Sequence, residues 1–271
     1  MLTLRQTVEY MNAKFPQQQL ELADFDVSNK RPFTQHYPSY LFRGQRSIEW
    51  KTTHATIFRN EPLVVQLKSD IDKWIAGQHP LLGVQINNYT LYYFLREALW
   101  EKSCVDGLPD DFDVQQTIAG IMQHYGLDTA MIDLTADLHT AAFFASNQAV
   151  PGTIGQLMVV PTENLAGSIF NLAADQCLRA RRQQAHALLG TSGLDLQSDN
   201  FKDKFNAKWF SFQLTDDDVK TFHNPTLLSI EGDLTARSIV NWYDHHIRGS
   251  EEISVGFKTY LAKKVNTLRI H

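Results

Sequence analysis

Residues 40–45 read YLFRGQ, three β-prone residues followed by a cation, a glycine and an amide. The apolar start predicts a short strand, which Gly44 is expected to end. Because a guanidinium is costly to bury unless it is paired or touches an anion, Arg43 is a candidate for a binding site. Gly44 lacks a side chain, which would let a ligand approach the backbone closely. The alternative is a structural salt bridge made from an edge strand.

Two contrasting segments precede this stretch. Residues 2–15 place apolar side chains at roughly helical spacing, which predicts an amphipathic helix that packs on the body of the protein. Residues 16–38 are polar and are interrupted by Pro16, Pro32 and Pro38, so we expect a loop there.

Helices dominate the prediction from residue 61 to residue 125. The stretch 61–103 carries two apolar helical faces that are separated by Gly77 and by His79-Pro80. A third helix is expected over 112–125 and is closed by Gly126.

The second half of the chain mixes strands with helices. Residues 131–134 resemble a strand, after which Asp137 or Thr135 could cap a helix that buries an alanine-rich face. The run 154–160 is the clearest strand, and a helix is expected over 233–248 with Asp233 as a possible N-cap. Further short strands are expected at 184–189, 208–214 and 226–230.

Composition and element order together predict a single domain of the α+β class. The chain has 271 residues, of which 43% are hydrophobic, and this is enough for one sizeable core. The order of elements lacks the regular β-α-β alternation of a doubly wound sheet. We therefore expect an N-terminal helix and loop over 1–38 and one domain over 39–271.

Charge, cysteine content and hydropathy together predict a soluble protein of the cytoplasm. Its net charge of -5 gives no overall attraction to nucleic acid or to an anionic membrane. Cys104 and Cys177 form no Cys-x-x-Cys pair and no disulfide framework. No apolar run approaches the roughly 20 residues that cross a bilayer, and the first 15 residues lack a signal-peptide core. A cytoplasmic protein without a membrane partner is expected.

Two pairs of polar residues lie where a pocket could form. His124 and Tyr125, at a predicted helix end, could stack on and hydrogen-bond a base or a nicotinamide ring. Alternatively, His124 interacts with the last helical carbonyls. Asp133 and Thr135 end the next strand at the expected mouth of a pocket, although both residue types are also ordinary N-caps.

A basic run supplies a further candidate. Arg179, Arg181 and Arg182 precede Gln183 and Gln184, and together they could contact a phosphate. The alternative is a solvated helix face. No metal site is expected, because adjacent histidines such as those at 245 and 246 point about 100° apart on a helix. Walker, Rossmann and Gly-x-Ser-x-Gly motifs are absent from the sequence.

In this order the motifs resemble the FRG domain family, which is named for the Phe42-Arg43-Gly44 triplet. The resemblance spans roughly residues 35–250. It rests on four stretches: 41–45 with 57–59, 123–135, 141–145, and Arg179 with Gln183 and Gln184. The chain departs from the family pattern at Asp128, Ala130, Leu134, Ala185 and Ala187. At residue 130 this chain has alanine where the family pattern has arginine.

The layout of this family is similar to that of ADP-ribosyltransferases, which implies a small-strand core, NAD as the nucleotide and glycosyl transfer as the reaction. By that resemblance Arg43 holds the pyrophosphate, His124 or Tyr125 stacks on the nicotinamide, and Gln183 orients the ribose. A carboxylate stabilises an oxocarbenium-like state better than an amide does, so Asp133 or Glu231 could replace Gln183.

The resulting set of candidates has two parts. The catalytic residues are expected to be Arg43, Gln183 and Asp133. The residues expected to bind the nucleotide are Arg43, Gly44, His124, Tyr125, Thr135 and Arg179.

Three functions remain open from the sequence. The first is an NAD-dependent ADP-ribosyltransferase with a protein, a nucleic acid or water as acceptor, acting as a toxin or in phage defence. The second is a non-catalytic module that senses a nucleotide or a phosphorylated ligand. The third is an interaction protein in which the motifs are purely architectural.

Overall fold

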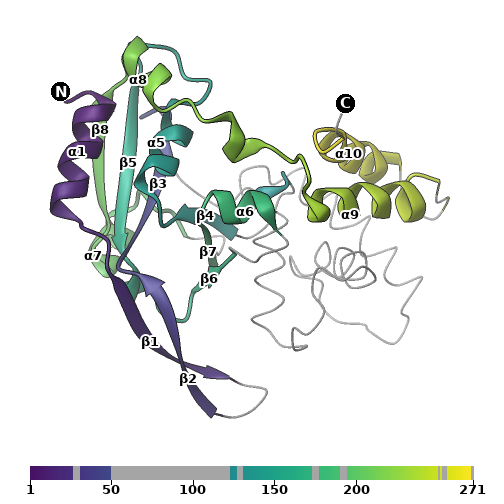
Figure 1. The fold of residues 1–271 in the computed structure, drawn as a ribbon, viewed down its shortest axis with the longest axis horizontal. Coiled ribbons are helices and arrows are strands. Elements are labelled where there is room, and N and C mark those ends of the chain that lie inside the picture. Colours follow the sequence, from purple (N-terminus) through teal and green to yellow (C-terminus); the bar gives the residue numbers. More distant parts are fainter. Residues whose placement is uncertain are drawn as a thin grey trace.

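The computed structural model describes residues 1–26, 31–49, 123–126, 131–172, 177–189, 194–249, 251 and 255–269. The helices expected over 61–103 and most of the helix expected over 112–125 lie outside the described residues. The described part combines helices with two antiparallel sheets, as an α+β protein does (Figure 1).

A six-stranded sheet forms the centre of the molecule, with the strand order β6-β7-β4-β3-β5-β8 and antiparallel pairing. The strands are β3 (Tyr40–Gln45), β4 (Met131–Thr135), β5 (Ile154–Pro161), β6 (Ile169–Asn171), β7 (Ala185–Leu189) and β8 (Lys208–Gln213). The strands predicted at 131–134, 154–160, 184–189 and 208–214 are thus confirmed. The expected end of the first strand at Gly44 is wrong by one residue, because β3 continues to Gln45.

The pairing between β3 and β4 is unusually short. Phe42 and Thr135 form the one register pair between these strands, whereas β3 pairs with β5 at every position from Tyr40 to Gln45. The sheet therefore opens between β3 and β4 beyond Phe42, next to Arg43, which stays paired with β5.

Residues 19–26 and 31–38 form a strand ribbon, so the prediction of a loop is wrong for these residues. Strand β1 (Gln19–Asp26) pairs with β2 (Arg31–Pro38) over eight positions, and the ribbon extends away from the main sheet (Figure 1). A two-stranded ribbon has two open edges, where a proline needs no backbone donor. Prolines are therefore compatible with this ribbon.

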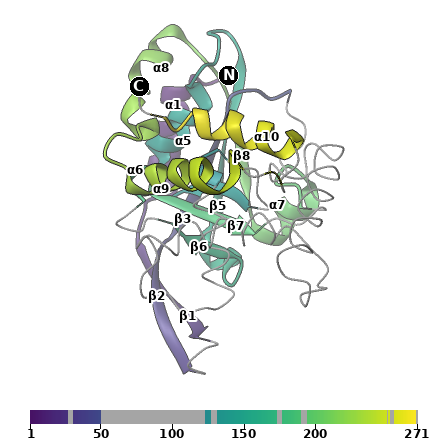
Figure 2. The ribbon, with the colours of Figure 1, turned by 90° about the vertical axis from the view of Figure 1, so that its right-hand side faces the viewer.

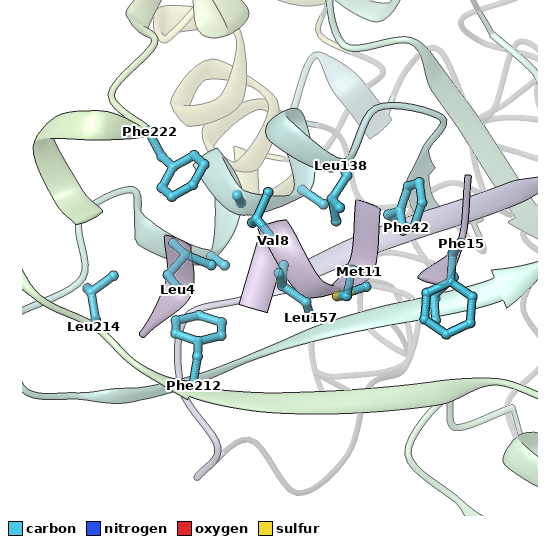
Figure 3. Packing of buried hydrophobic residues seen from close by; sticks show 14 residues of the cluster. Leu4, Val8, Met11, Phe15, Phe42, Leu138, Leu157, Phe212, Leu214 and Phe222 are labelled. Carbon is cyan, nitrogen blue, oxygen red and sulfur yellow. The ribbon is translucent and has the colours of Figure 1, made fainter. Parts of the chain in front are cut away.

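Two helices cover one face of the sheet. Helix α1 (Leu4–Lys14) confirms the predicted N-terminal helix and begins with a capping box at Thr3. Helix α5 (Leu138–Ser146) has Asp137 as its N-cap, which settles the alternatives in favour of Asp137. Both helices pack into the cluster shown in Figure 3, which contains Leu4, Met11, Phe42, Leu138, Leu157 and Phe212 among others.

A second apolar cluster lies on the opposite side of the sheet strands. Alternation along β3 and β4 places Leu41, Ile132 and Leu134 in this cluster, together with Met158 of β5. Helix α7 (Asp199–Phe205) contributes Phe201 to it.

The remaining elements connect and flank the sheet. They are a 3₁₀ helix (Thr162–Leu165), α6 (Leu178–Arg182), α8 (Asp216–Thr221), a second 3₁₀ helix (Pro225–Leu228), α9 (Leu234–Trp242), a π-helical turn (Tyr243–Ile247) and α10 (Val255–Asn266). Helices α9 and α10 lie beside each other at one side of the molecule (Figure 2). Among the described helices, none has the length and apolar character needed to cross a membrane.

The C-terminal predictions have mixed outcomes. Asp233 caps α9 as expected, accepting a hydrogen bond from the backbone N–H of Ala236. The strand expected at 226–230 is wrong, because Pro225 opens a 3₁₀ helix there. A proline fits the first turn of a helix, where its missing N–H has no partner to lose.

Candidate functional site

Arg43 lies at the opening between β3 and β4. Its Nη1 donates to the backbone carbonyl of Asp133 at 2.6 Å. That carbonyl belongs to a position of β4 without a register partner in β3, so the guanidinium stands where a ladder hydrogen bond would otherwise form. Because β3 is an inner strand, the alternative of a salt bridge from an edge strand does not describe this position.

Gly44 serves the packing of helix α5. A Cβ at this residue would lie 1.8 Å from the carbonyl oxygen of Ala141 and 2.8 Å from the backbone nitrogen of Ala145. Real Cβ contacts are never this short, so the space next to Gly44 is filled by the helix backbone. The prediction that Gly44 leaves room for a ligand is therefore wrong on this side of the strand, and the glycine is required for packing instead.

His124 and Gln183 form the core of a polar cluster. The Nδ1 atom of His124 lies 2.7 Å from Oε1 of Gln183, and the Gln183 Nε2 donates to the carbonyl of Leu227 at 2.7 Å. Gln183 is 2% exposed, and each end of its amide has a protein partner. The expected role of Gln183 as a group that touches the ribose is therefore not supported by its position.

Asp133 faces the other nitrogen of the same imidazole ring. Its Oδ1 lies 3.4 Å from Nε2 of His124, within the range of an ion pair, although the two atoms form no hydrogen bond. The Asp133 side chain is 39% exposed, against 5% for that of His124. The histidine is thus enclosed, and Asp133 is the member of the pair that reaches the surface.

Thr135 completes this group from the end of β4. Its hydroxyl donates to the backbone carbonyl of Gln183 at 2.7 Å and accepts from the N–H of Asp137 at 3.0 Å. Thr135 is 5% exposed. It links β4 to the turn after α6 and is not placed to bind a ligand directly.

Tyr125 belongs to a different network from its neighbour His124. Its side chain is fully buried, and its hydroxyl donates to Oδ2 of Asp233 at 2.6 Å. Burial, with the hydrogen bond to Asp233, raises the pKa of this phenol far above its usual value. The prediction that Tyr125 stacks on a nicotinamide ring is wrong, because no part of the ring is accessible.

Arg179 joins the two networks. Its backbone N–H donates to Oδ2 of Asp233 at 3.1 Å, while its side chain is half-buried. Burial lowers the pKa of this guanidinium, and the neighbouring Tyr125, Asp233 and Asp133 act in the opposite direction. Its Nε is buried without a hydrogen-bond partner in the described part of the chain. By contrast, Arg181 and Arg182 are exposed, as a solvated helix face would be.

Sequence reasoning missed the importance of three positions. Asp233 appeared only as a helix cap, yet it is fully buried and accepts from Tyr125 as well as from two backbone N–H groups. Leu227 contributes a backbone carbonyl, which no side-chain pattern reveals. His186 in β7 is 4% exposed, and burial lowers its pKa to about 4. Glu231, the other proposed carboxylate, is exposed and has no described contact with the cluster.

A family comparison covers the first part of this site. Residues 38–152 match the FRG domain. The FRG match includes Arg43, His124, Asp133 and Thr135, and it supports the family resemblance that these motifs indicated. The residues of the site from Arg179 onward lie beyond the FRG match. No curated protein and no solved structure matches the chain.

The arrangement combines cations with one accessible carboxylate beside a histidine. Arg43 and Arg179 present guanidinium groups, which suit phosphate oxygens. Asp133 presents a carboxylate that could stabilise positive charge or accept a proton. In the described residues no group of histidine, cysteine and acidic side chains has the arrangement of a metal site.

Proposed function

We propose that this FRG-domain chain binds NAD at the Arg43–Asp133 site and transfers ADP-ribose from it. The strongest support is that the candidate residues contact one another. Arg43, His124, Asp133 and Gln183 lie far apart in sequence, yet direct contacts link them into one group.

Under this proposal the two arginines bind the pyrophosphate. A guanidinium offers a planar fork of donors that matches phosphate oxygens. Arg43 is positioned by the carbonyl of Asp133, and Arg179 is half-buried, with no hydrogen-bond partner for its Nε among the described residues.

Asp133 takes the role that the sequence first gave to Gln183. Opening of the glycosidic bond releases nicotinamide and leaves positive charge on the ribose, which a carboxylate stabilises better than an amide dipole. Asp133 is accessible, whereas the amide of Gln183 is buried and engaged at both ends. The acceptor in this proposal is a protein, a nucleic acid or water.

Nicotinamide release from NAD by the purified full chain tests the proposal. Wild-type protein is expected to release nicotinamide, and Asp133→Asn is expected to lower the rate by at least about tenfold, since the charge that stabilises the transition state is gone. Arg43→Lys retains the charge but loses the fork, so it should weaken binding of NAD. Arg46→Ala, three residues later and on the same segment, is the matched control. No release by the wild-type chain, with and without cell extract, contradicts the enzymatic proposal.

The second candidate is a sensor that binds a nucleotide without turnover. It is favoured by Tyr125 and Gln183, because both are engaged in internal hydrogen bonds and neither is available for the chemistry first assigned to it. The sensor predicts that ADP-ribose or NAD raises the melting temperature without release of nicotinamide. The same rise should be lost in Arg43→Lys and kept in Arg182→Ala, which alters an exposed arginine.

We further propose that the chain acts as a cytoplasmic toxin or defence effector. Expression of the wild-type chain in bacteria is then expected to slow growth, and expression of Asp133→Asn is not. Equal growth in both cultures, with equal protein levels, argues against a toxic activity.

A further inference from the structure

Gln183 has a buried amide whose orientation is fixed by its surroundings. The carbonyl of Leu227 can only accept a hydrogen bond, so the atom that faces it at 2.7 Å must be the amide nitrogen. The amide oxygen therefore faces His124 and can only accept in turn. It follows that Nδ1 of His124 carries a proton in this arrangement.

The second ring nitrogen, Nε2, then makes an unfavourable contact with Asp133. If Nδ1 holds the only proton, Nε2 presents a lone pair to Oδ1 of Asp133, 3.4 Å away. Both atoms are buried and, within the part of the chain that the structure describes, have no hydrogen-bond partner. Two electron-rich atoms in a site shielded from water repel each other, and one additional proton between them removes the repulsion. The proton can reside on His124, as an ion pair with Asp133, or on the carboxyl group.

We propose that Gln183 is a positioning residue that fixes His124 with a proton on Nδ1, so that Nε2 and Asp133 hold a second proton between them. The proton-sharing pair exists without a ligand. Its use at the ligand site rests on the proposed function, because Asp133 is the member of the pair that is accessible there. Since Oδ1 is buried, the other side of the carboxyl group is the part that a ligand can reach.

The charged and titratable groups around the pair come from several elements. Arg179 of α6 interacts electrostatically with Asp133, and Arg43 of β3 donates to the backbone carbonyl of Asp133. His186 of β7 interacts with His124, but burial lowers the pKa of His186 to about 4, so it is neutral near pH 7. His186 therefore adds no positive charge beside His124.

Histidine side-chain NMR on the full chain without nucleotide tests this directly. In wild-type protein we expect Nδ1 of His124 to be protonated at every pH at which the chain stays folded. Gln183→Glu retains an acceptor for Nδ1 and should preserve this state when its carboxyl group is protonated and donates to the Leu227 carbonyl. Gln183→Met removes the acceptor, so the neutral ring should change to the tautomer with its proton on Nε2, where Asp133 is then the remaining acceptor. Gln184→Met alters the exposed neighbouring side chain and should change nothing.

A second variant keeps the test decisive if the methionine variant fails to fold. Asp133→Asn replaces the carboxylate with an amide, which cannot share the second proton, so Nδ1 should stay protonated while the Nε2 signal changes to that of a lone pair accepting from the amide. A wild-type ring with a bare Nδ1, or an Nε2 signal that is the same in wild type and in Asp133→Asn, overturns the proposal. These spectra contain no NAD, so a failure to release nicotinamide would leave this inference standing, and the reverse also holds.

Discussion

His124 and Tyr125 are neighbours in the chain, yet they enter two networks of opposite character. Tyr125 lies in a fully buried network in which Asp233 accepts hydrogen bonds from a hydroxyl and from backbone N–H groups. His124 lies in a network that reaches the surface through Asp133 and contains buried polar atoms without hydrogen-bond partners. A complete buried network stabilises a fold, whereas an incomplete one beside the surface is typical of a site that binds something.

The largest effect is expected from Asp233→Ala. This substitution deprives Tyr125, Arg179 and Ala236 of a shared acceptor in the core. Removing one partner of a buried, hydrogen-bonded charged group costs roughly 3–5 kcal/mol of the free energy of unfolding. Denaturant unfolding of the variant measures this loss. A loss below about 1 kcal/mol would show that the buried network is not the stabilising one, and the contrast with the His124 network would disappear.

The second largest effect is expected in the pH dependence of the free energy of unfolding, through the buried side chain of His186. Its folded-state pKa of about 4 lies below the ordinary value of 6.5, because the buried ring resists charging. The unfolded chain therefore binds a proton at a pH where the folded chain does not, and stability falls as the pH drops from about 6.5 to about 4. The loss attributable to this residue is roughly 2–3 kcal/mol.

The measurement is the free energy of unfolding across that pH range for the wild-type chain and for His186→Asn. The variant should show a flatter profile between pH 6.5 and 4. His223→Asn changes an exposed histidine and should follow the wild-type profile. Parallel profiles for wild type and His186→Asn contradict the prediction.

Tyr125→Phe is expected to have a smaller effect of the same kind. It removes the hydroxyl that donates to Asp233 at 2.6 Å but leaves the ring packing unchanged. Loss of one hydrogen bond to a charged group costs roughly 1–2 kcal/mol. Thermal unfolding should record this cost while nucleotide binding, measured by calorimetry, is unaltered. A variant that folds normally but fails to bind would return Tyr125 to the ligand site.

The smallest change in stability is expected from Asp133→Asn. The backbone carbonyl that accepts from Arg43 remains, and the side chain is partly exposed. We expect less than about 1 kcal/mol in the free energy of unfolding, because partly solvated charge pairs contribute little. A loss as large as that of Asp233→Ala would make the His124 network structural rather than functional.

Much of the fold could be predicted because local sequence determines it. The spacing of apolar residues defined α1, the apolar run defined β5, and Asp137 and Asp233 marked the helix starts that they cap. The β1–β2 ribbon was missed because its prolines indicated a loop. Pro225 likewise begins a helical turn where a strand was expected, since a short run with apolar residues does not by itself distinguish a strand from a 3₁₀ turn.

The sequence indicated which residues form the candidate cluster, but not which contacts they make. The residue types at 43, 124, 133 and 183 indicated a binding site, and the structure places them together. The roles of Gln183 and Tyr125 depend on the carbonyl of Leu227 and the carboxylate of Asp233, which approach from distant parts of the chain. Such partners are set by tertiary packing, which no local pattern contains.

The single register pair between β3 and β4 also bears on the mechanics of the sheet. The strands β6, β7 and β4 form one well-paired set and β3, β5 and β8 another, so the backbone ladder between the two sets has one rung. Amide protons near that rung lack the neighbouring ladder bonds that slow their exchange elsewhere. We therefore expect hydrogen exchange to divide this continuous sheet into two slowly exchanging blocks, with the boundary just beyond Phe42.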